Sequence, residues 1–413
     1  MLHTEKNMIP QKWIKIVFIN LFIVALLGAV MRYKIAYSLP FVDQDNFLQA
    51  HSHFAFAGWV SQVLMVLMWD VLQKYLPADS LRKYQGLLLA NLLAAYGTLL
   101  SFVWQGSGAV STLFSSSTIL ISWIFAWVFW RDLNKIKIVN TSFYWFKAAL
   151  LFNVISSFGA FFISYVVAYN IQEPNWYLAA MYYFLHFQYN GWFFFACGGL
   201  LMEEVSSQMP LKLQKSIFWL FALACVPAYF LSALWLPIPA WVYALVVAAA
   251  IADLTGWYLL ITFFIKKSPV AYQHLPPQTK WLFVLSATAL SIKVALQLGS
   301  TIPYLSRLAF GFRPVVIGYL HLMFLGVISI FIIGYCKKNQ FIRPDKSGIT
   351  GITILVAGIV LNEIFLMIQG LSYMNYVSVP YISQLLLGAS VCMLVGVALL
   401  IPAVTKTSIS GIH

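Results

Sequence analysis

Long apolar stretches, separated by short polar turns, recur along the chain from end to end. There are twelve, each about 20 residues long, and a helix of that length crosses roughly 30 Å of hydrocarbon. No stretch large enough for a soluble domain is left between them. The pattern predicts an all-α integral membrane protein of about twelve transmembrane helices, forming a single domain over residues 1–413. The stretches centre near Leu26, Leu64, Leu92, Ile119, Ile155, Phe187, Leu223, Ala248, Ala289, Val327, Ile359 and Ala389.

Composition agrees with this pattern. Hydrophobic residues make up 62% of the 413 residues and charged residues only 9%, too few to cover a water-soluble protein of this size. The first stretch begins near Ile14 without a small-residue cleavage site, so we expect a retained helix rather than a signal peptide. The four cysteines lack CxxC or other paired spacing, which argues against a disulfide framework, a zinc site or covalently attached haem. The lipid bilayer is the expected partner.

The net charge of +13 is explained by membrane topology better than by nucleic acid, which we do not expect as a partner. Lysines and arginines cluster at the N-terminus and in every second loop. By the positive-inside bias, those loops and both termini are predicted to be cytoplasmic. Four cations lie near the opposite face and need a separate explanation: Arg32, Lys34, Arg307 and Arg313.

Three segments of the chain align without gaps, and each contains His-x4-Gly followed by an apolar residue. Their histidines are His53, His186 and His321, which are 133 and 135 positions apart. Glycine accounts for only 23 residues, so chance is a poor explanation of this regularity. We therefore predict three pseudo-symmetric four-helix units, each with its histidine in the second helix and in the outer half of the membrane. The units cover approximately residues 1–140, 141–275 and 276–413.

Histidine is costly inside a bilayer unless it is paired or bound to a metal. The candidate metal ligands are therefore His51, His53, His186 and His321. On a helix, residues 51 and 53 lie roughly 200° apart around the axis, so their side chains cannot easily coordinate the same ion. Such a pair suits the axial positions of planar haems better than a compact zinc site. The alternatives are a hydrogen bond to a neighbouring helix and, for His51, hydration at the membrane interface.

With these features the chain resembles subunit I of the haem-copper oxidase superfamily, which includes cbb3-type oxidases and nitric oxide reductases. Residues 50–60, with His51, His53, Gly58 and Trp59, resemble the His-x-His-x4-Gly-Trp segment of the tenth helix of cbb3-type catalytic subunits. Residues 186–199 are similar to their sixth helix, which holds a copper-ligating histidine. Residues 321–326 resemble NnrS, a haem- and copper-containing membrane family linked to nitric oxide stress.

The resemblance implies a bacterial-type inner (plasma) membrane location and at least one b-type haem. His321 and either His51 or His53 would supply its axial ligands, and His186 would remain as a copper ligand. Haem propionates are carboxylates, which arginine binds bidentately. Arg307 and Arg313 are the first candidates for this contact, and Arg32 and Lys34 the second. An electron-donor protein or quinol is the implied redox partner.

Departures from the family limit the implied function. Tyr319 stands where the family has the histidine of the high-spin haem, and the seventh helix, around residues 225–229, has no histidine. Tyrosine ligates haem iron in some proteins, but an ordinary buried aromatic is the plainer interpretation of Tyr319. The binuclear centre is therefore expected to be incomplete. An electron-transfer or nitric-oxide-related role is favoured over full oxygen reduction, and an enzymatic activity, if any, would be that of an oxidoreductase. Because the second helix resembles the family's tenth best, an arrangement rotated by one unit stays open.

A second hypothesis is a proton-coupled membrane transporter whose histidines are structural. Three ionisable groups fall at membrane depth: Asp253, Lys293 and Glu363. Such groups mark ion paths or pair with one another. A plain Asp253–Lys293 pair is the simpler interpretation of the first two.

Overall fold

The computed structural model describes residues 8–267 and 269–404. It is 84% helical, and no β-strand occurs within those ranges. Ten helices in the described part of the chain are long and apolar enough to cross a membrane. The chain is therefore an all-helical integral membrane protein, as the hydropathy pattern predicts.

Ten of the twelve expected stretches coincide with these ten helices. The stretches around Phe187 and Leu223 are helical but do not meet the same criteria. The first carries the polar residues Gln188 and Asn190 at its centre, which lowers its hydropathy. The second ends as an α-helix at Cys225 and continues as a short 3₁₀ helix.

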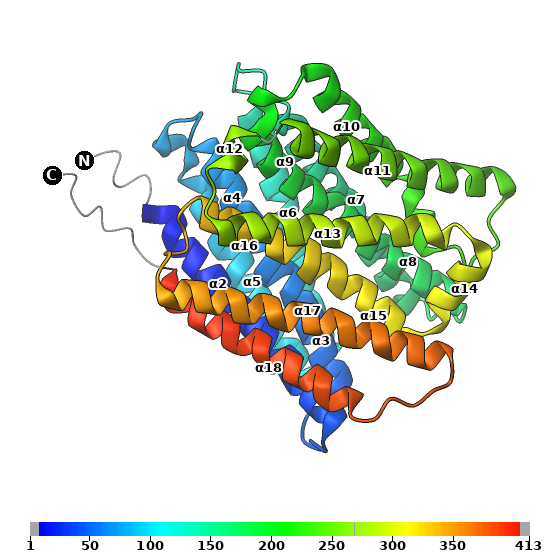
Figure 1. Cartoon of the computed structure of the whole chain (residues 1–413). Coiled ribbons are helices and arrows are strands. Elements are labelled where there is room, and N and C mark those ends of the chain that lie inside the picture. The colour runs from blue at the N-terminus through cyan, green and yellow to red at the C-terminus, as the bar shows by residue number, and fades with distance from the viewer. Residues whose placement is uncertain (1–7, 268, 405–413) are drawn as a thin grey trace. The chain divides into compact units, whose positions relative to one another are not determined.

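The chain divides into two compact units. Unit 1 comprises residues 1–125, 329–369 and 378–413, and unit 2 comprises residues 126–328 and 370–377. Figure 1 labels the helices. Those that begin in unit 1 are α2 (Met8–Ala36), α3 (Gln44–Phe54), η1 (Ala55–Ser61), α4 (Gln62–Leu72), η2 (Ala78–Leu81), α5 (Lys83–Gln105), α6 (Ala109–Leu133), α16 (Ile330–Lys338), α17 (Lys346–Met374), α18 (Ile382–Leu400) and η7 (Ile401–Ala403).

The helices that begin in unit 2 follow the same convention, with η marking π and 3₁₀ helices. They are α7 (Ser142–Ala168), α8 (Pro174–His186), η3 (Phe187–Phe193), α9 (Phe194–Val205), η4 (Ser206–Gln208), α10 (Leu211–Cys225), η5 (Pro227–Ser232), α11 (Ala240–Lys267), α12 (Val270–Gln273), α13 (Pro277–Ser300), α14 (Pro303–Gly311), α15 (Arg313–His321) and η6 (Leu322–Ser329). The division into three repeats stays a prediction.

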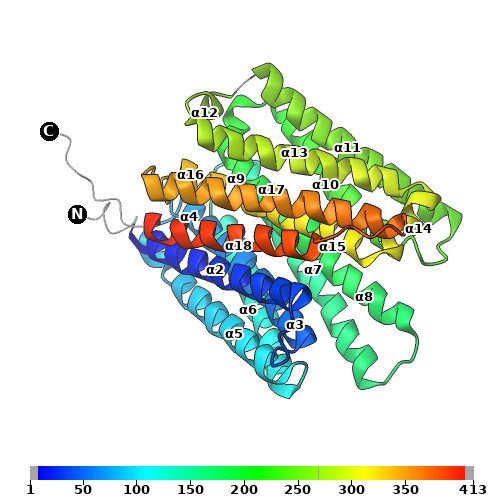
Figure 2. The same ribbon diagram turned by 60° about the horizontal axis from the view of Figure 1, so that its bottom comes forward.

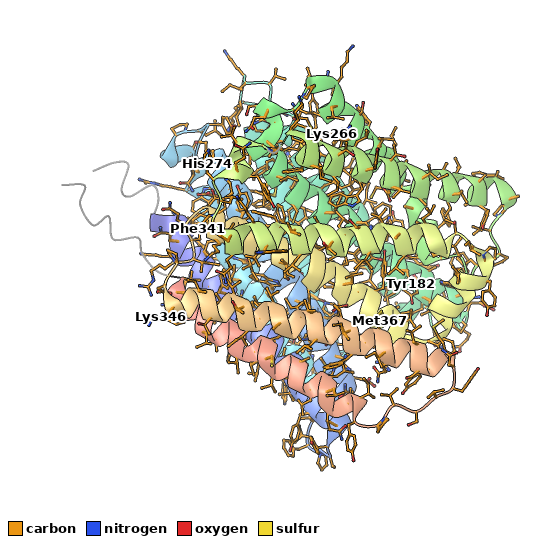
Figure 3. The ribbon with its side chains drawn as sticks, viewed as in Figure 1. Tyr182, Lys266, His274, Phe341, Lys346 and Met367 are labelled. Carbon is orange, nitrogen blue, oxygen red and sulfur yellow. The ribbon has the colours of Figure 1, made fainter. Side chains whose placement is uncertain are left out.

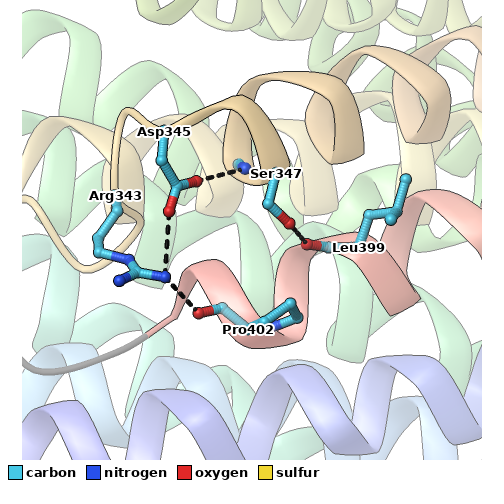
Figure 4. A network of polar contacts seen from close by, with 6 residues as sticks. Arg343, Asp345, Ser347, Leu399 and Pro402 are labelled. Atoms are coloured by element: carbon cyan, nitrogen blue, oxygen red, sulfur yellow. Dashed lines mark hydrogen bonds and ion pairs between the residues drawn. The ribbon is translucent and has the colours of Figure 1, made fainter.

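In unit 1, the long helices α17 and α18 run side by side, with α2 next to α18 (Figures 1 and 2). Polar contacts join the start of α17 to the end of α18 and to η7 (Figure 4), next to Lys346, which Figure 3 labels; Ser347 donates to the Leu399 carbonyl of α18 at 2.7 Å. Asp345 accepts a hydrogen bond from the Gly348 amide at 2.8 Å and pairs with Arg343 at 3.0 Å. Arg343 also donates to the Pro402 carbonyl at 2.9 Å. These contacts satisfy backbone groups that helix ends would otherwise leave without partners.

In unit 2, small residues let α10, η5 and α11 pack closely. Ala224, Ala228, Val246 and Ala250 are all buried and belong to one apolar cluster. Without long side chains between them, these backbones can approach closely, as is common between membrane helices. The next long helix, α13, lies beside α11 in Figures 1 and 2.

A π-helix follows each of the three motif histidines. η1 begins two residues after His53, whereas η3 and η6 begin directly after His186 and His321. Each contains the glycine of its His-x4-Gly motif. π-helices are rare and occur mostly as short insertions, frequently at functional sites. The same rare geometry therefore recurs at all three motifs.

Polar side chains from neighbouring helices bond to carbonyls in two of these π-helices. In unit 1, the buried Asn20 donates to the Gly58 carbonyl at 2.6 Å, and Asn91 donates to the Ala57 carbonyl at 3.0 Å. In unit 2, Ser286 donates to the Val327 carbonyl at 2.7 Å. A π turn breaks the regular hydrogen-bond ladder, and lipid offers no replacement donor. These side chains supply donors where water cannot.

The motif glycines have a packing role. A Cβ added to Gly191 would lie 2.5 Å from the Cβ of Phe152 on α7, and one added to Gly326 would lie 3.0 Å from the Cβ of Ala289 on α13. A Cβ atom is fixed to its backbone and cannot swing away, so a larger residue would force the helices apart. Gly191 and Gly326 thus let a neighbouring helix approach the π turn.

We predict that Gly191→Ala lowers the free energy of unfolding by about 1–3 kcal/mol, because Phe152 must be displaced. Equilibrium unfolding in mixed detergent micelles measures this. Gly388→Ala on α18 is the control, since no atom lies within 4 Å of its added Cβ. It should be neutral or stabilise by up to about 1 kcal/mol through helix propensity. Equal effects of the two substitutions would contradict the packing role of Gly191.

Candidate functional site

His51 and His53 lie near the end of α3, whose start is fixed by a capping residue. The Asp43 carboxylate accepts hydrogen bonds from the Asp45 and Asn46 amides at 3.0 and 2.9 Å. This caps the first turn and sets where the helix begins. The two histidine rings contact different helices of unit 1, as their helical spacing predicts.

The His51 ring is held against α2. Its Nδ1 lies 3.1 Å from the Val24 carbonyl oxygen, so the Nδ1–H donates to that carbonyl. The ring passes over Gly28, where an added Cβ would lie 3.4 Å from the His51 Cε1. In this tautomer Nε2 keeps its lone pair, and among the described residues it has no hydrogen-bond partner. Metal-binding histidines are commonly oriented in this way, by a backbone carbonyl on the other nitrogen.

The His53 ring stacks on Phe102 of α5, with ring centroids 4.6 Å apart and an interplanar angle of 23°. Its side chain is exposed, although its neighbour Phe54 is fully buried. Within the described residues no hydrogen bond fixes the His53 ring. Its orientation is therefore set by stacking alone, whereas His51 is fixed by a hydrogen bond.

The four outer cations differ in their surroundings. Arg32 lies within electrostatic range of both the His51 ring and the Glu363 carboxylate, all in unit 1. Lys34 donates to the Val42 carbonyl, which gives it a local structural partner. Arg313 is exposed at the start of α15. The Arg307 side chain lies outside the described residues, so its assignment to a propionate stays a prediction.

In unit 2, both ring nitrogens of His186 have protein partners. Nε2 lies 2.8 Å from the Cys225 carbonyl oxygen and therefore carries the proton that it donates. Nδ1 lies 3.1 Å from the Asn190 amide nitrogen and accepts from it. The ring is fully buried and neutral in this arrangement, with both nitrogens in use. The hydrogen bond to a neighbouring helix, the simpler of the two interpretations, describes His186.

Pro227 explains why the Cys225 carbonyl can accept this bond. In a continuous helix that carbonyl would accept from the amide of Tyr229. At Pro227 the α-helix gives way to a 3₁₀ helix, and the Tyr229 amide bonds to Val226 instead. The carbonyl at the end of α10 is thus available to the histidine.

A small cavity of about 20 Å³ borders His186 in unit 2. It is also lined by Asn190, Cys225, Asp253 and Lys293, which come from four different helical segments. Only 8% of Asp253 and 5% of Lys293 is exposed. The two charges act on each other electrostatically, but in the part of the chain that the structure describes no direct ion pair joins them. The expected Asp253–Lys293 pair is therefore not a direct ion pair in the described part of the chain.

His321 ends α15, and its Nδ1 lies 2.8 Å from the Ile317 carbonyl oxygen of the same helix. As in His51, the Nδ1–H donates to a backbone carbonyl. Tyr319 packs edge-to-face against Tyr189, with ring centroids 6.4 Å apart. Tyr319 is half-buried, and this contact is typical of an ordinary packed aromatic residue.

No group of three or more His, Cys, Asp or Glu side chains converges as a metal site within the described ranges. No protein-family model matches the sequence, and no curated protein matches it either. A function for this chain is therefore inferred from the arrangement of its own residues.

Sequence reasoning missed the amides that organise these sites: Asn20, Asn91 and Asn190. Asn190 carried one signal, because it follows His186 by four residues and so shares its helix face. Asn20 and Asn91 carried none, since nothing in a sequence shows which carbonyl of another helix will lack a donor.

We predict that His186→Ala lowers the free energy of unfolding by about 2–4 kcal/mol, because it opens a cavity and removes the partner of the Cys225 carbonyl. His274→Ala, on an exposed loop residue labelled in Figure 3, is the control and should stay within about 0.5 kcal/mol of the parent. Equilibrium unfolding of both variants under one condition makes the comparison. A loss at His186 no larger than that at His274 would contradict the structural role.

Proposed function

We propose that this chain is a haem-binding membrane protein that resembles subunit I of the haem-copper oxidases, with twelve transmembrane helices in three four-helix units. The observation that carries the proposal is the orientation of His51, which lies two residues before the first motif histidine. His51 directs its Nδ1–H to the Val24 carbonyl, which leaves the Nε2 lone pair as the one that can bind iron. The π-helix that recurs after each motif histidine supports the threefold repeat.

Some of the candidate histidines can bind iron, whereas His186 cannot bind copper in this arrangement. His51 has an Nε2 suited to an axial bond, and His53 has a ring without a fixed hydrogen bond. The sequence resemblance alone assigns His321 as the second ligand. His186 has no lone pair to offer copper while Asn190 and Cys225 hold its ring. The haem is therefore the part of the predicted cofactor set that we propose, and copper stays a prediction from the resemblance alone.

The contributions of the residues follow from their positions. A bound b-type haem would supply one-electron transfer or a binding site for nitric oxide. The Val24 carbonyl holds the His51 ring in one tautomer and raises the basicity of its Nε2. Arg32, close to His51, is a more fitting propionate partner than the exposed Arg313. An electron-donor protein or a quinol would be the redox partner.

We expect the purified protein from haem-replete cells to show a Soret band and a pyridine haemochrome of b type. His321→Ala should abolish the low-spin spectrum, because it removes an axial ligand. Of His51→Ala and His53→Ala, the one that replaces the second ligand should do the same, and the structure favours His51. His274→Ala is the matched control and should leave the spectrum unchanged. Colourless, iron-free protein from such cells would overturn the proposal.

Proton-coupled transport is a second candidate function, favoured by the buried charges beside the cavity of unit 2. Asp253 and Lys293 are buried in the same small space, and Glu363 in unit 1 bonds only to the Asn362 amide at 3.1 Å among its described contacts. Ionisable groups inside a bilayer commonly serve proton or ion pathways.

If the protein carries protons, Asp253→Asn should abolish potential-driven proton uptake by liposomes that contain it, measured with an enclosed pH-sensitive dye. A neutral amide cannot take up and release a proton at this position. The control is Asp45→Asn, which makes the same change at an exposed residue near the start of α3. Uptake that is equal in both variants would argue against this function.

A further inference from the structure

The cavity of unit 2 has the size and lining of a site for a single water molecule. Its volume is about 20 Å³, and a space of roughly 10–15 Å³ already accepts one water when two to four polar groups surround it. Phe194, Phe221 and Val294 form apolar walls, so the polar lining groups converge on a small space. A larger ligand would not fit without displacing these walls.

An unpartnered oxygen in this lining points to a hydrogen-bond donor. Asn190 is 8% exposed, and its amide nitrogen is committed to His186 Nδ1. That bond fixes the amide orientation, because His186 must accept at Nδ1 while it donates at Nε2 to Cys225. Among the described residues, the Asn190 Oδ1 then has no hydrogen-bond partner. A buried acceptor without a partner is costly, so a donor in the cavity would stabilise it.

A group that bridges the charges of Asp253 and Lys293 would stabilise both of them. Asp253 on α11 and Lys293 on α13 line the cavity and act on each other, yet no direct ion pair joins them within the described ranges. Buried charges need compensation at close range. A water molecule can accept from the Lys293 ammonium and donate to both the Asp253 carboxylate and the Asn190 oxygen. A metal cation would instead be repelled by the ammonium.

We propose that this cavity is a proton-exchange site that holds one water molecule, with Asp253 and Lys293 as the exchanging groups and Asn190 as the anchor of the water. The exchange balances within the site. An N–H bond of Lys293 breaks and the proton joins the water oxygen, while a water O–H bond breaks and that proton joins an Asp253 oxygen. The charged pair becomes a neutral amine and a neutral carboxylic acid, and the water is regenerated.

The surrounding titratable groups come from each neighbouring segment. His186 on α8 is kept neutral by its two partners, and the Cys225 thiol on α10 lies near both charges. Tyr319 on α15 lies within electrostatic range of Asp253 and packs against Tyr189 of η3. None of these groups places a further charge in the cavity at neutral pH. Asp253 and Lys293 are thus the groups that exchange.

Infrared difference spectroscopy of the full chain in phosphatidylcholine vesicles, recorded between two pH values, tests the proposal. We expect a carboxylic-acid C=O band that is lost in Asp253→Asn, and a water O–H band that shifts in heavy-oxygen water. Val294→Ile adds a methyl group to the cavity wall and should abolish the water band. Val284→Ile makes the same change at an exposed position of the same helix and should preserve the band.

Ala228→Val, on another wall of the cavity, gives a second displacing variant if Val294→Ile does not fold. A water band that is absent from the parent, or that persists in the displacing variants, would overturn the water site. A water band without a C=O band that depends on Asp253 would overturn the proton exchange. The water site requires neither haem binding nor transport. If the Soret band or the proton uptake is absent, the proposed functions fail, but the infrared bands still test the water site separately.

Discussion

Backbone carbonyls in this protein must find donors inside the protein, because lipid supplies none. A regular α-helix meets this demand by itself, but a π turn or a proline does not. At three such places a side chain supplies the donor: Asn20 at the Gly58 carbonyl, Ser286 at the Val327 carbonyl, and His186 at the Cys225 carbonyl. The positions of the polar side chains follow largely from this constraint.

The same constraint separates the histidines into two kinds. His186 satisfies a carbonyl through Nε2 and receives a hydrogen bond at Nδ1, so both of its ring nitrogens already have partners inside the protein. His51 satisfies a carbonyl through Nδ1, and its Nε2 has no hydrogen-bond partner among the described residues. Two histidines that the sequence offers as metal ligands, His186 and His51, therefore differ in chemistry. Iron binding fits the second kind, and a hydrogen-bonded structural role describes the first.

Use of His186 as a structural group has a consequence for the space beside it. The Asn190 amide nitrogen donates a hydrogen bond to the His186 ring. The Asn190 amide oxygen is therefore turned toward a cavity that is also lined by a buried acid and a buried base. In a haem-copper oxidase-like protein this part of the fold would be expected to hold copper. Here aromatic and aliphatic walls reduce it to the size of a water molecule. Proton exchange, rather than metal binding, is the chemistry that these residues can perform.

The sequence by itself determined the fold class, because apolar runs of membrane-spanning length can be recognised without tertiary information. It also located the His-x4-Gly motifs and the buried charges Asp253 and Lys293. Two of the twelve expected spans, around Phe187 and Leu223, do not meet the length and hydropathy criteria in the structure, since polar residues and Pro227 interrupt them. Only the tertiary structure decided which nitrogen of each histidine is engaged and that Asn190 shares a cavity with Asp253 and Lys293. The reason is physical: a tautomer and a cavity depend on which carbonyls and side chains other helices bring within about 3 Å, and no local pattern encodes that.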